Sequence, residues 1–224
     1  MTTANSLGRT VREMLDVLFD AELILIPNPV AVDGDVVAWK SPTPLDRFVD
    51  FADYPTVRSY RRWAEAGEYS ALLPDGAMIQ LRYKVSDRAI GGHRLAYVPC
   101  PYRVDTDMLL SEALSDVLDV HAVGSHDEVT MQSTVRFDLD PDSAAEGHPA
   151  AHLTLNVASC RIACESPMTP AQFVRFIFRN FYAAQWSAHQ ALFESLPDTD
   201  HDSTIKDAER LSPHMAWRRA SATA

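Results

Sequence analysis

Residues 78–98 have the sequence MIQLRYKVSDRAIGGHRLAYV, and this stretch decides the fold class. In the segment Met78–Val85, apolar and polar side chains alternate from Ile79 onward, as they do in a β-strand that buries one face. Gly91-Gly92 indicates a turn, and His93–Val98 indicates the strand that follows it. Strands joined by such short connections pair antiparallel, so the sequence predicts an antiparallel sheet.

Further strands and helices are predicted on both sides of this stretch. The other segments that favour strands are Val36–Lys40, Ser70–Leu73, Thr134–Asp140, His152–Val157 and Cys160–Cys164. Apolar residues at helical spacing predict helices that begin near Asn5, near Pro55, after Asp105 and after Thr169. Because strands and helices do not alternate regularly, a doubly wound parallel sheet is disfavoured. The predicted fold class is α+β, with a mainly antiparallel sheet of about five to six strands packed with N-terminal, central and long C-terminal helices.

The last predicted helix has the strongest signals. Thr169 and Gln172 fit a capping box, and Pro170 stands where a helix start tolerates proline. The apolar stripe that follows consists of Phe173, Phe176, Ile177, Phe181 and Ala184, widened by Phe178, Tyr182 and Trp186. A helix this apolar is expected to be buried, either in its own domain or against a partner.

The length of 224 residues allows one large domain or two small ones. We predict a single domain over residues 1–196. Residues 197–224 are rich in Pro, Asp and Ser and show weak periodicity, so they are predicted to form a mobile tail.

Composition predicts a soluble, cytoplasmic, bacterial protein. The three cysteines lack the spacing of disulfide or zinc pairs, and neither a secretory signal nor a membrane-spanning stretch is recognisable. The basic residues are 17 Arg and 3 Lys, a skew that is typical of GC-rich bacterial genomes. A net charge of −11 and a pI near 5.1 weigh against broad binding of nucleic acid or membranes.

Acidic residues concentrate in residues 104–146, which contain eleven Asp or Glu against one basic residue, Arg136. This segment therefore carries −10 of the net charge of −11. Such a band can bind a protein partner or cations, or it can keep a helix face solvated. A protein partner or a second copy of the chain is the partner that we expect.

Polar side chains share one face of two neighbouring strands in this prediction. Alternation places the polar residues of 134–140 and of 152–157 opposite the apolar ones. If these strands pair, carboxylates, histidine and arginine meet on one surface, as an active-site hypothesis requires. The candidate catalytic residues are Asp138, Asp140, His148, His152 and Arg161. The candidate ligand-binding residues are Arg82, Lys84, Arg136 and Asn156.

A divalent metal is a possible cofactor, with Asp138, His148 and His152 as its ligands. In an extended strand, two residues four positions apart would lie about 13 Å from each other. Chelation therefore requires the chain to turn between Gly147 and Ala151. Two other interpretations stay open: structural ion pairs between arginines and carboxylates, with a histidine that holds the loop, or a site for a ligand or phosphate.

Five short motifs stand out along the chain: HRLAYVP (93–99), RFDLD (136–140), HPAAHLTL (148–155), CRI (160–162) and TPAQFVRFIFRNFY (169–182). Together they resemble a bacterial domain family of unknown function, over residues 10–193. The resemblance implies an association with mobile-element or phage-defence genes. It supplies no catalytic residues that could be carried over.

Three functions follow from these observations. The first is a non-catalytic component of a multi-protein bacterial system that binds partners through the acidic band or the last helix; the uneven charge and the lack of a complete catalytic motif favour it. The second is a metal-dependent hydrolase or nuclease-like enzyme that uses the Asp/His/Arg cluster. The third is a sensor of an anionic small ligand or of nucleic acid, on the Arg-rich polar face.

Overall fold

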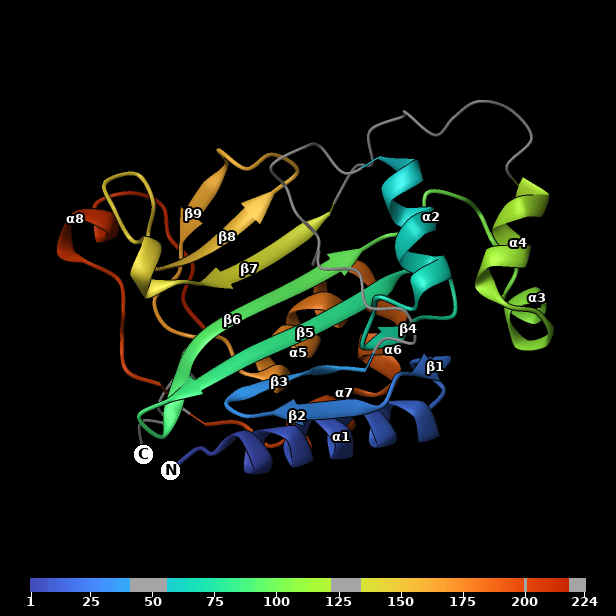
Figure 1. Ribbon diagram of the computed structural model, residues 1–224, viewed down its shortest axis with the longest axis horizontal. Helices are drawn as coiled ribbons and strands as arrows, with labels where there is room; N and C mark the ends of the chain where they lie inside the picture. Colours follow the sequence, from blue (N-terminus) through green and yellow to red (C-terminus); the bar gives the residue numbers. More distant parts are fainter. Residues whose placement is uncertain (41–55, 122–133, 200, 218–224) are drawn as a thin grey trace.

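The computed structural model describes residues 1–40, 56–121, 134–199 and 201–217 (Figure 1). The strands are β1 (Ile26–Pro27), β2 (Val30–Asp33), β3 (Val36–Trp39), β4 (Ala71–Leu72), β5 (Met78–Ser86), β6 (Ala89–Val98), β7 (Val135–Leu139), β8 (Ala151–Leu155) and β9 (Arg161–Ala163). Within the described residues they form one sheet of nine strands in the order β1-β4-β5-β6-β7-β8-β9, with β3 also paired to β5 and β2 to β3. All these pairs are antiparallel, which confirms the predicted α+β class and antiparallel sheet.

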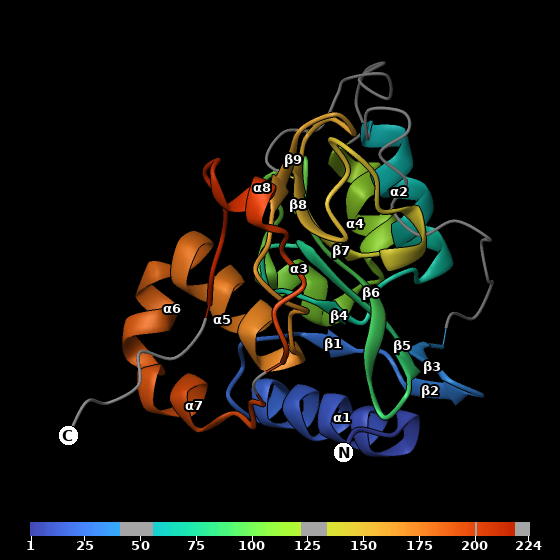
Figure 2. The same ribbon diagram turned by 90° about the vertical axis from the view of Figure 1, so that its left-hand side faces the viewer.

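The helices cover both faces of this sheet (Figures 1 and 2). They are α1 (Ala4–Asp20), α2 (Val57–Ala66), α3 (Thr106–Ser111), α4 (Leu114–His121), the 3₁₀ helix η1 (Pro141–Ser143), α5 (Pro170–Phe181), α6 (Ala183–Ala188), α7 (Gln190–Ser195) and α8 (Asp207–Arg210). α1 and α5 pack on one face, where Leu81 and Phe137 belong to the larger apolar core. α2, α3 and α4 pack on the opposite face, over Met78 and Val98. None of the helices in the described parts of the chain is long and apolar enough to cross a membrane.

The sheet has more strands than the predicted five to six because several are very short. The strands that the sequence does not predict are β1, with two residues, and β2, with four, whereas β4 lies within the predicted strand Ser70–Leu73. Segments of this length are too short to show alternation, and β1 includes Pro27, a residue that weakens a strand prediction. These strands form through pairing with their neighbours rather than through a pattern of their own.

The turn between β5 and β6 lies at Asp87–Arg88, so its predicted position at Gly91-Gly92 is wrong. Asp87 and Arg88 both have positive φ, 50° and 63°, as a two-residue hairpin turn requires. Gly91 lies inside β6, where the register shifts and a Cβ would come within 1.8 Å of the Ser86 Oγ. The glycines therefore accommodate an irregularity in the ladder, and β6 is longer than expected.

α5 begins where the sequence predicts it. Thr169 is the N-cap and exchanges hydrogen bonds with Gln172 in a capping box. Phe173 and Phe178, at 0% and 1% exposure, lie in the protein's own core. Of the two expected environments for this helix, its own domain is therefore the one that the structure shows.

Two predicted helices are interrupted. The last helix ends at Phe181 because Tyr182 leaves the helical conformation (φ −131°, ψ 57°), so Trp186 belongs to α6. The central helix is divided into α3 and α4 because Glu112 is extended (φ −131°, ψ 156°). Periodicity alone does not reveal these breaks, since the apolar spacing continues across both.

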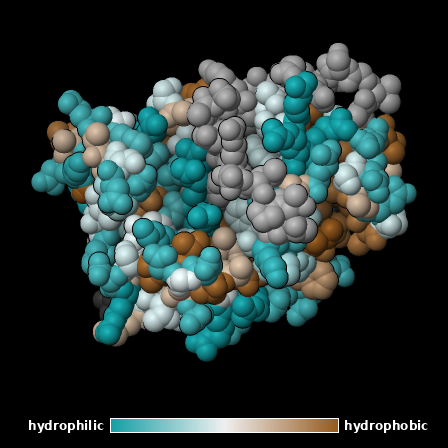
Figure 3. Space-filling model, viewed as in Figure 1, coloured by the Kyte–Doolittle hydropathy of each residue, from teal (hydrophilic) through white to brown (hydrophobic). Residues whose placement is uncertain are grey.

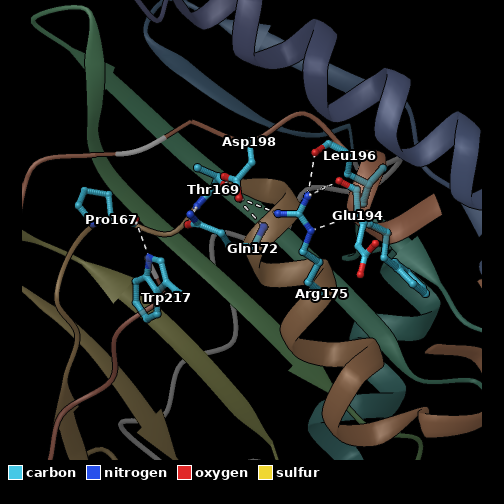
Figure 4. Close-up of polar contacts among 9 residues, drawn as sticks. Pro167, Thr169, Gln172, Arg175, Glu194, Leu196, Asp198 and Trp217 are labelled. Atoms are coloured by element: carbon cyan, nitrogen blue, oxygen red, sulfur yellow. Dashed lines mark hydrogen bonds and ion pairs between the residues drawn. The ribbon is translucent and has the colours of Figure 1, made fainter. Parts of the chain in front are cut away.

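Arg175 of α5 fixes the end of α7 (Figure 4). Its Nε donates to the carbonyl oxygen of Phe193 at 2.8 Å, and its Nη2 donates to that of Leu196 at 2.9 Å. Its Nη1 lies 2.6 Å from the Asp198 carboxylate, which also accepts the hydroxyl of Thr169 at 2.8 Å. The start of α5, the end of α7 and the residues that follow are thereby held together.

Residues 201–217 continue from this point to the β9 edge of the sheet. The N–H of Met215 donates to the carbonyl of Ala163 at 2.9 Å, and the N–H of Glu165 donates to the carbonyl of Met215 at 2.8 Å. The domain boundary at residue 196 and the mobility of the tail stay predictions, and part of that tail lies outside the described residues.

Candidate functional site

Five basic side chains lie on one face of strands β5 to β9. α2 packs on this same face of the sheet (Figure 1). We call these residues the basic face: Arg82, Lys84, Arg94, Arg136 and Arg161. The register pairs Arg82 with Arg94 and Arg94 with Asp138, and directly opposed residues of an antiparallel pair share a face. The structure thus brings Arg82, Lys84 and Arg136 onto one surface, and their role in ligand binding stays a prediction.

Asp138 lies among the arginines of this face and is 4% exposed. Its Oδ1 lies 3.0 Å from the Nε of Arg94, and its Oδ2 lies 2.6 Å from the Nε of Arg136. One buried carboxylate therefore accepts hydrogen bonds from two guanidinium groups on the neighbouring strand and on its own strand. Such charge-assisted hydrogen bonds are strong where water is excluded.

His152 of β8 lies directly opposite Asp138 and is 2% exposed. Its Nδ1 lies 2.8 Å from the carbonyl oxygen of Pro149, so this nitrogen carries a proton and donates it. Its Nε2 lies 3.5 Å from Oδ2 of Asp138. Burial lowers the pKa of His152, and the Asp138 carboxylate partly offsets that effect. The ring is therefore held in one orientation by the Pro149 carbonyl.

The rings of His148 and His152 come within 5.0 Å, centroid to centroid. The chain turns at Gly147 (φ +71°), and Ala145 forms a bridge with His148, so this turn precedes His148. Within the described residues, however, no group of three or more His, Cys, Asp or Glu side chains is placed to hold a metal ion. Because both oxygens of Asp138 face guanidinium groups, the geometry favours the ion-pair interpretation.

Two of the predicted site residues lie outside the cluster. Asp140 follows β7 and caps η1, where its Oδ1 accepts the N–H of Ser143 at 3.3 Å. Asn156 lies beyond the end of β8 with φ +56°, so it forms the turn toward β9. Asn adopts this left-handed conformation more readily than most residues. Alternation places both residues wrongly because it assumes that each strand continues.

Arg94 belongs to the cluster but is not among the residues predicted for it. The sequence does contain a signal for the face on which Arg94 lies. Leu95 and Tyr97 of the same strand are apolar core positions, and Arg94 alternates with them, so it points to the opposite face of the sheet. With the turn predicted at residues 91–92, however, the strand register that brings Arg94 next to Asp138 is not predicted. With the turn at residues 87–88, Arg94 falls opposite Arg82 and next to Asp138.

His93 lies on the other face of the sheet and makes the stability of the protein depend on pH. Burial lowers its pKa from 6.5 to about 4; the Asp138 carboxylate partly opposes this, and His201 adds to it. The unfolded chain takes up the proton near pH 6.5, whereas the folded protein does not until about pH 4. Stability present at pH 7 is therefore lost as the pH falls through this window, by about 3 kcal/mol from this group.

Urea unfolding at pH 7 and at pH 4.5 measures this loss. In the variant His93→Gln, whose side chain can still accept the Met168 N–H that His93 Nε2 accepts at 3.0 Å, the decrease should be clearly smaller. An equal decrease in both proteins would assign the pH dependence to other groups.

Comparison with models of known protein families identifies a family for this chain. A family model described as "Uncharacterized conserved protein (DUF2290)" matches residues 25–217. The chain belongs to this family. Membership in DUF2290 confirms the expected resemblance to a domain family of unknown function, although the DUF2290 match begins later and ends later than residues 10–193. The whole basic face lies within the DUF2290 match.

No curated protein and no solved structure gives a significant match to the chain. The bacterial origin and the association with phage-defence or mobile-element genes stay predictions.

Proposed function

We propose that this DUF2290 protein is a non-catalytic binding protein that holds an anionic ligand on the basic face. The charge balance of that face supports the proposal. Strands β5 to β9, all of them described, place five Arg or Lys side chains on it and one carboxylate, that of Asp138. A concentration of positive charge attracts anions locally, even on a chain whose net charge is −11.

The ion pairs of Asp138 do not neutralise all the positive charge of the basic face. One carboxylate balances one positive charge, and Arg82 and Lys84 are both exposed. The Arg94 side chain is also 42% exposed. Figure 3 shows hydrophilic side chains on the surface over β6 and β7. An anion that approaches this side of the sheet therefore meets accessible cationic groups.

The state of the acid/base residues supports binding rather than catalysis. Asp138 and His152, the pair best suited to proton transfer, are 4% and 2% exposed. Their polar atoms face Arg94, Arg136 and the carbonyl of Pro149. They are thus placed to hold the arginines and the loop in position.

Binding of a protein partner through the acidic segment 104–146 stays a separate prediction, and Asp127 and Glu128 of that segment lie outside the described residues. Phe173, Ile177 and Phe178 of α5 lie in the protein's own core, whereas Phe181 at the end of the helix is 39% exposed. On the acidic helices, Leu110 and Val120 are 68% and 59% exposed, so they are the apolar positions to examine for such a partner.

Reversing the two exposed charges of β5 tests the proposed function. The double variant R82E/K84E should bind a fluorescein-labelled heparin oligosaccharide at least about tenfold more weakly at low ionic strength, because it replaces two attractive charges by two repulsive ones. Fluorescence anisotropy at several salt concentrations measures the affinity and its dependence on salt. The salt dependence should be shallower in the variant, since fewer counterions are displaced.

The double variant R9E/R12E is the matched control. It changes the net charge equally, but Arg9 and Arg12 are exposed residues of α1, which packs on the other face of the sheet. Equal loss of binding in both double variants would show an effect of net charge alone and would contradict the proposal. Wild-type protein that binds no heparin at low ionic strength would contradict it as well.

A further inference from the structure

One row of the basic face places a threonine between two arginines. Thr154 of β8 pairs with Arg136 of β7 on one side and with Arg161 of β9 on the other. Adjacent strands lie about 4.8 Å apart, so these three side chains project from the same face of the sheet as close neighbours.

Two polar atoms of this row are buried without a hydrogen-bond partner among the described residues. Thr154 is 0% exposed, and its Oγ1 accepts and donates nothing there. The Nε of Arg161 is likewise buried and unpartnered, although the residue as a whole is half-buried. Native proteins satisfy nearly all such groups, and each exception calls for an explanation. Their position side by side suggests that one ligand satisfies both.

The chemistry of the row specifies the ligand's charge. Its two guanidinium groups can only donate hydrogen bonds, and the threonine hydroxyl can donate one more. A metal ion would be repelled here, whereas an oxyanion would be held by several donors at once. Asp138 binds the Nε of Arg136 at 2.6 Å and so fixes the direction of that guanidinium group. Arginines oriented in this way are well suited to bidentate binding of phosphate.

We infer that Arg136, Thr154 and Arg161 form a binding site for a phosphoryl group, an inference that rests on the proposed function and names the anchoring group of its ligand. Donors from three adjacent strands match an anion that offers at least three oxygens, as a terminal phosphate does. The remaining cations, Arg94, Arg82 and Lys84, lie on β6 and β5 next to this site and face the rest of a larger anionic ligand.

Two oligonucleotide probes test this inference. A labelled single-stranded oligonucleotide with a 5′-phosphate should bind the wild-type protein about tenfold more tightly than the same oligonucleotide with a 5′-hydroxyl, the gain expected from hydrogen bonds to a charged group. The variant Thr154→Val keeps the shape of the side chain without its hydroxyl, and it should lose most of that difference. Arg161→Ala should abolish the difference.

Inorganic phosphate separates the two sources of such a group. If it binds wild-type protein and binds Thr154→Val at least about fivefold more weakly, while the 5′-phosphate confers no advantage, the site still takes a phosphoryl group and its source is free phosphate. Equal binding of both probe types by wild type and Thr154→Val would overturn the inference.

The control variant is Thr204→Val, which also removes an unpartnered buried hydroxyl but lies in the C-terminal segment. It should bind both probes as the wild type does. If Thr154→Val does not fold, Arg161→Ala, at a half-buried position, gives the decisive comparison. Loss of heparin binding in R82E/K84E together with unchanged phosphate binding in Thr154→Val would reject this inference alone, whereas failure of both ligands to bind wild type would reject the proposed function.

Discussion

Replacing Asp138 with alanine is expected to lower the free energy of unfolding by about 3–5 kcal/mol. The carboxylate is 4% exposed and accepts hydrogen bonds from Arg94 and Arg136. Without it, the Arg136 guanidinium, which is 7% exposed, loses the carboxylate oxygen that lies 2.6 Å from its Nε. Removing one member of a buried ion pair is costly, because the remaining charge keeps its desolvation penalty and loses an attraction that offset it. Urea unfolding of Asp138→Ala and wild type at pH 7 measures the difference.

Asp142→Ala is the matched control, because Asp142 is exposed and lies in η1, just beyond the same strand. Its effect should stay within about 0.5 kcal/mol. If Asp138→Ala also falls within about 1 kcal/mol of wild type, the carboxylate does not hold the buried arginine, and the orientation inferred for Arg136 loses its basis.

The second large effect is expected on the opposite face of the sheet. Phe137 is 1% exposed and packs edge-to-face against Phe173, Phe176 and Trp217, with ring centroids 6.1, 5.0 and 6.0 Å away. Its replacement by alanine removes contacts among β7, α5 and the C-terminal segment at once. The expected loss of stability is about 3–5 kcal/mol, as for other large-to-small changes at buried aromatic positions.

Denaturant unfolding of Phe137→Ala, with Leu110→Ala as the control at a position that is 68% exposed, measures this loss. Because neighbouring residues of a strand point to opposite faces, the folded fraction of Phe137→Ala should still bind heparin with the affinity of wild type. A loss below about 1 kcal/mol would contradict the packing described for this face.

The face assignments of β5, β7 and β8 could be predicted from the sequence. Arg136 and Asp138 alternate with Val135, Phe137 and Leu139, and a shift of one residue would put charges into the core. Burial thus decides the orientation of these strands before any pairing is known. The capping box of α5 can also be predicted from the sequence, because it depends on only two residues that are three positions apart.

What could not be predicted depends on neighbours that are distant in the sequence or on single backbone conformations. The strands β1 and β2 form through their pairing with β4 and β3. At the turn, Asp87 and Arg88 adopt the left-handed conformation although neither is glycine. The sequence therefore favours the nearby Gly91-Gly92 as the turn. Within the site, the contact of Arg94 with Asp138 requires the register of β6 on β7, which follows from that turn.

The contact of Met215 with the backbone of β9 has a consequence for solubility. A strand at the border of a sheet presents unpaired N–H and C=O groups, which can recruit strands of other molecules. The bridge between Cys164 and Met215 occupies part of this border with the chain's own C-terminal segment. The segment that the sequence predicts to be a mobile tail thus covers part of this edge. Shortening the chain at residue 196 would remove the partners of the Ala163 carbonyl and the Glu165 N–H and leave these groups open to strands of other molecules.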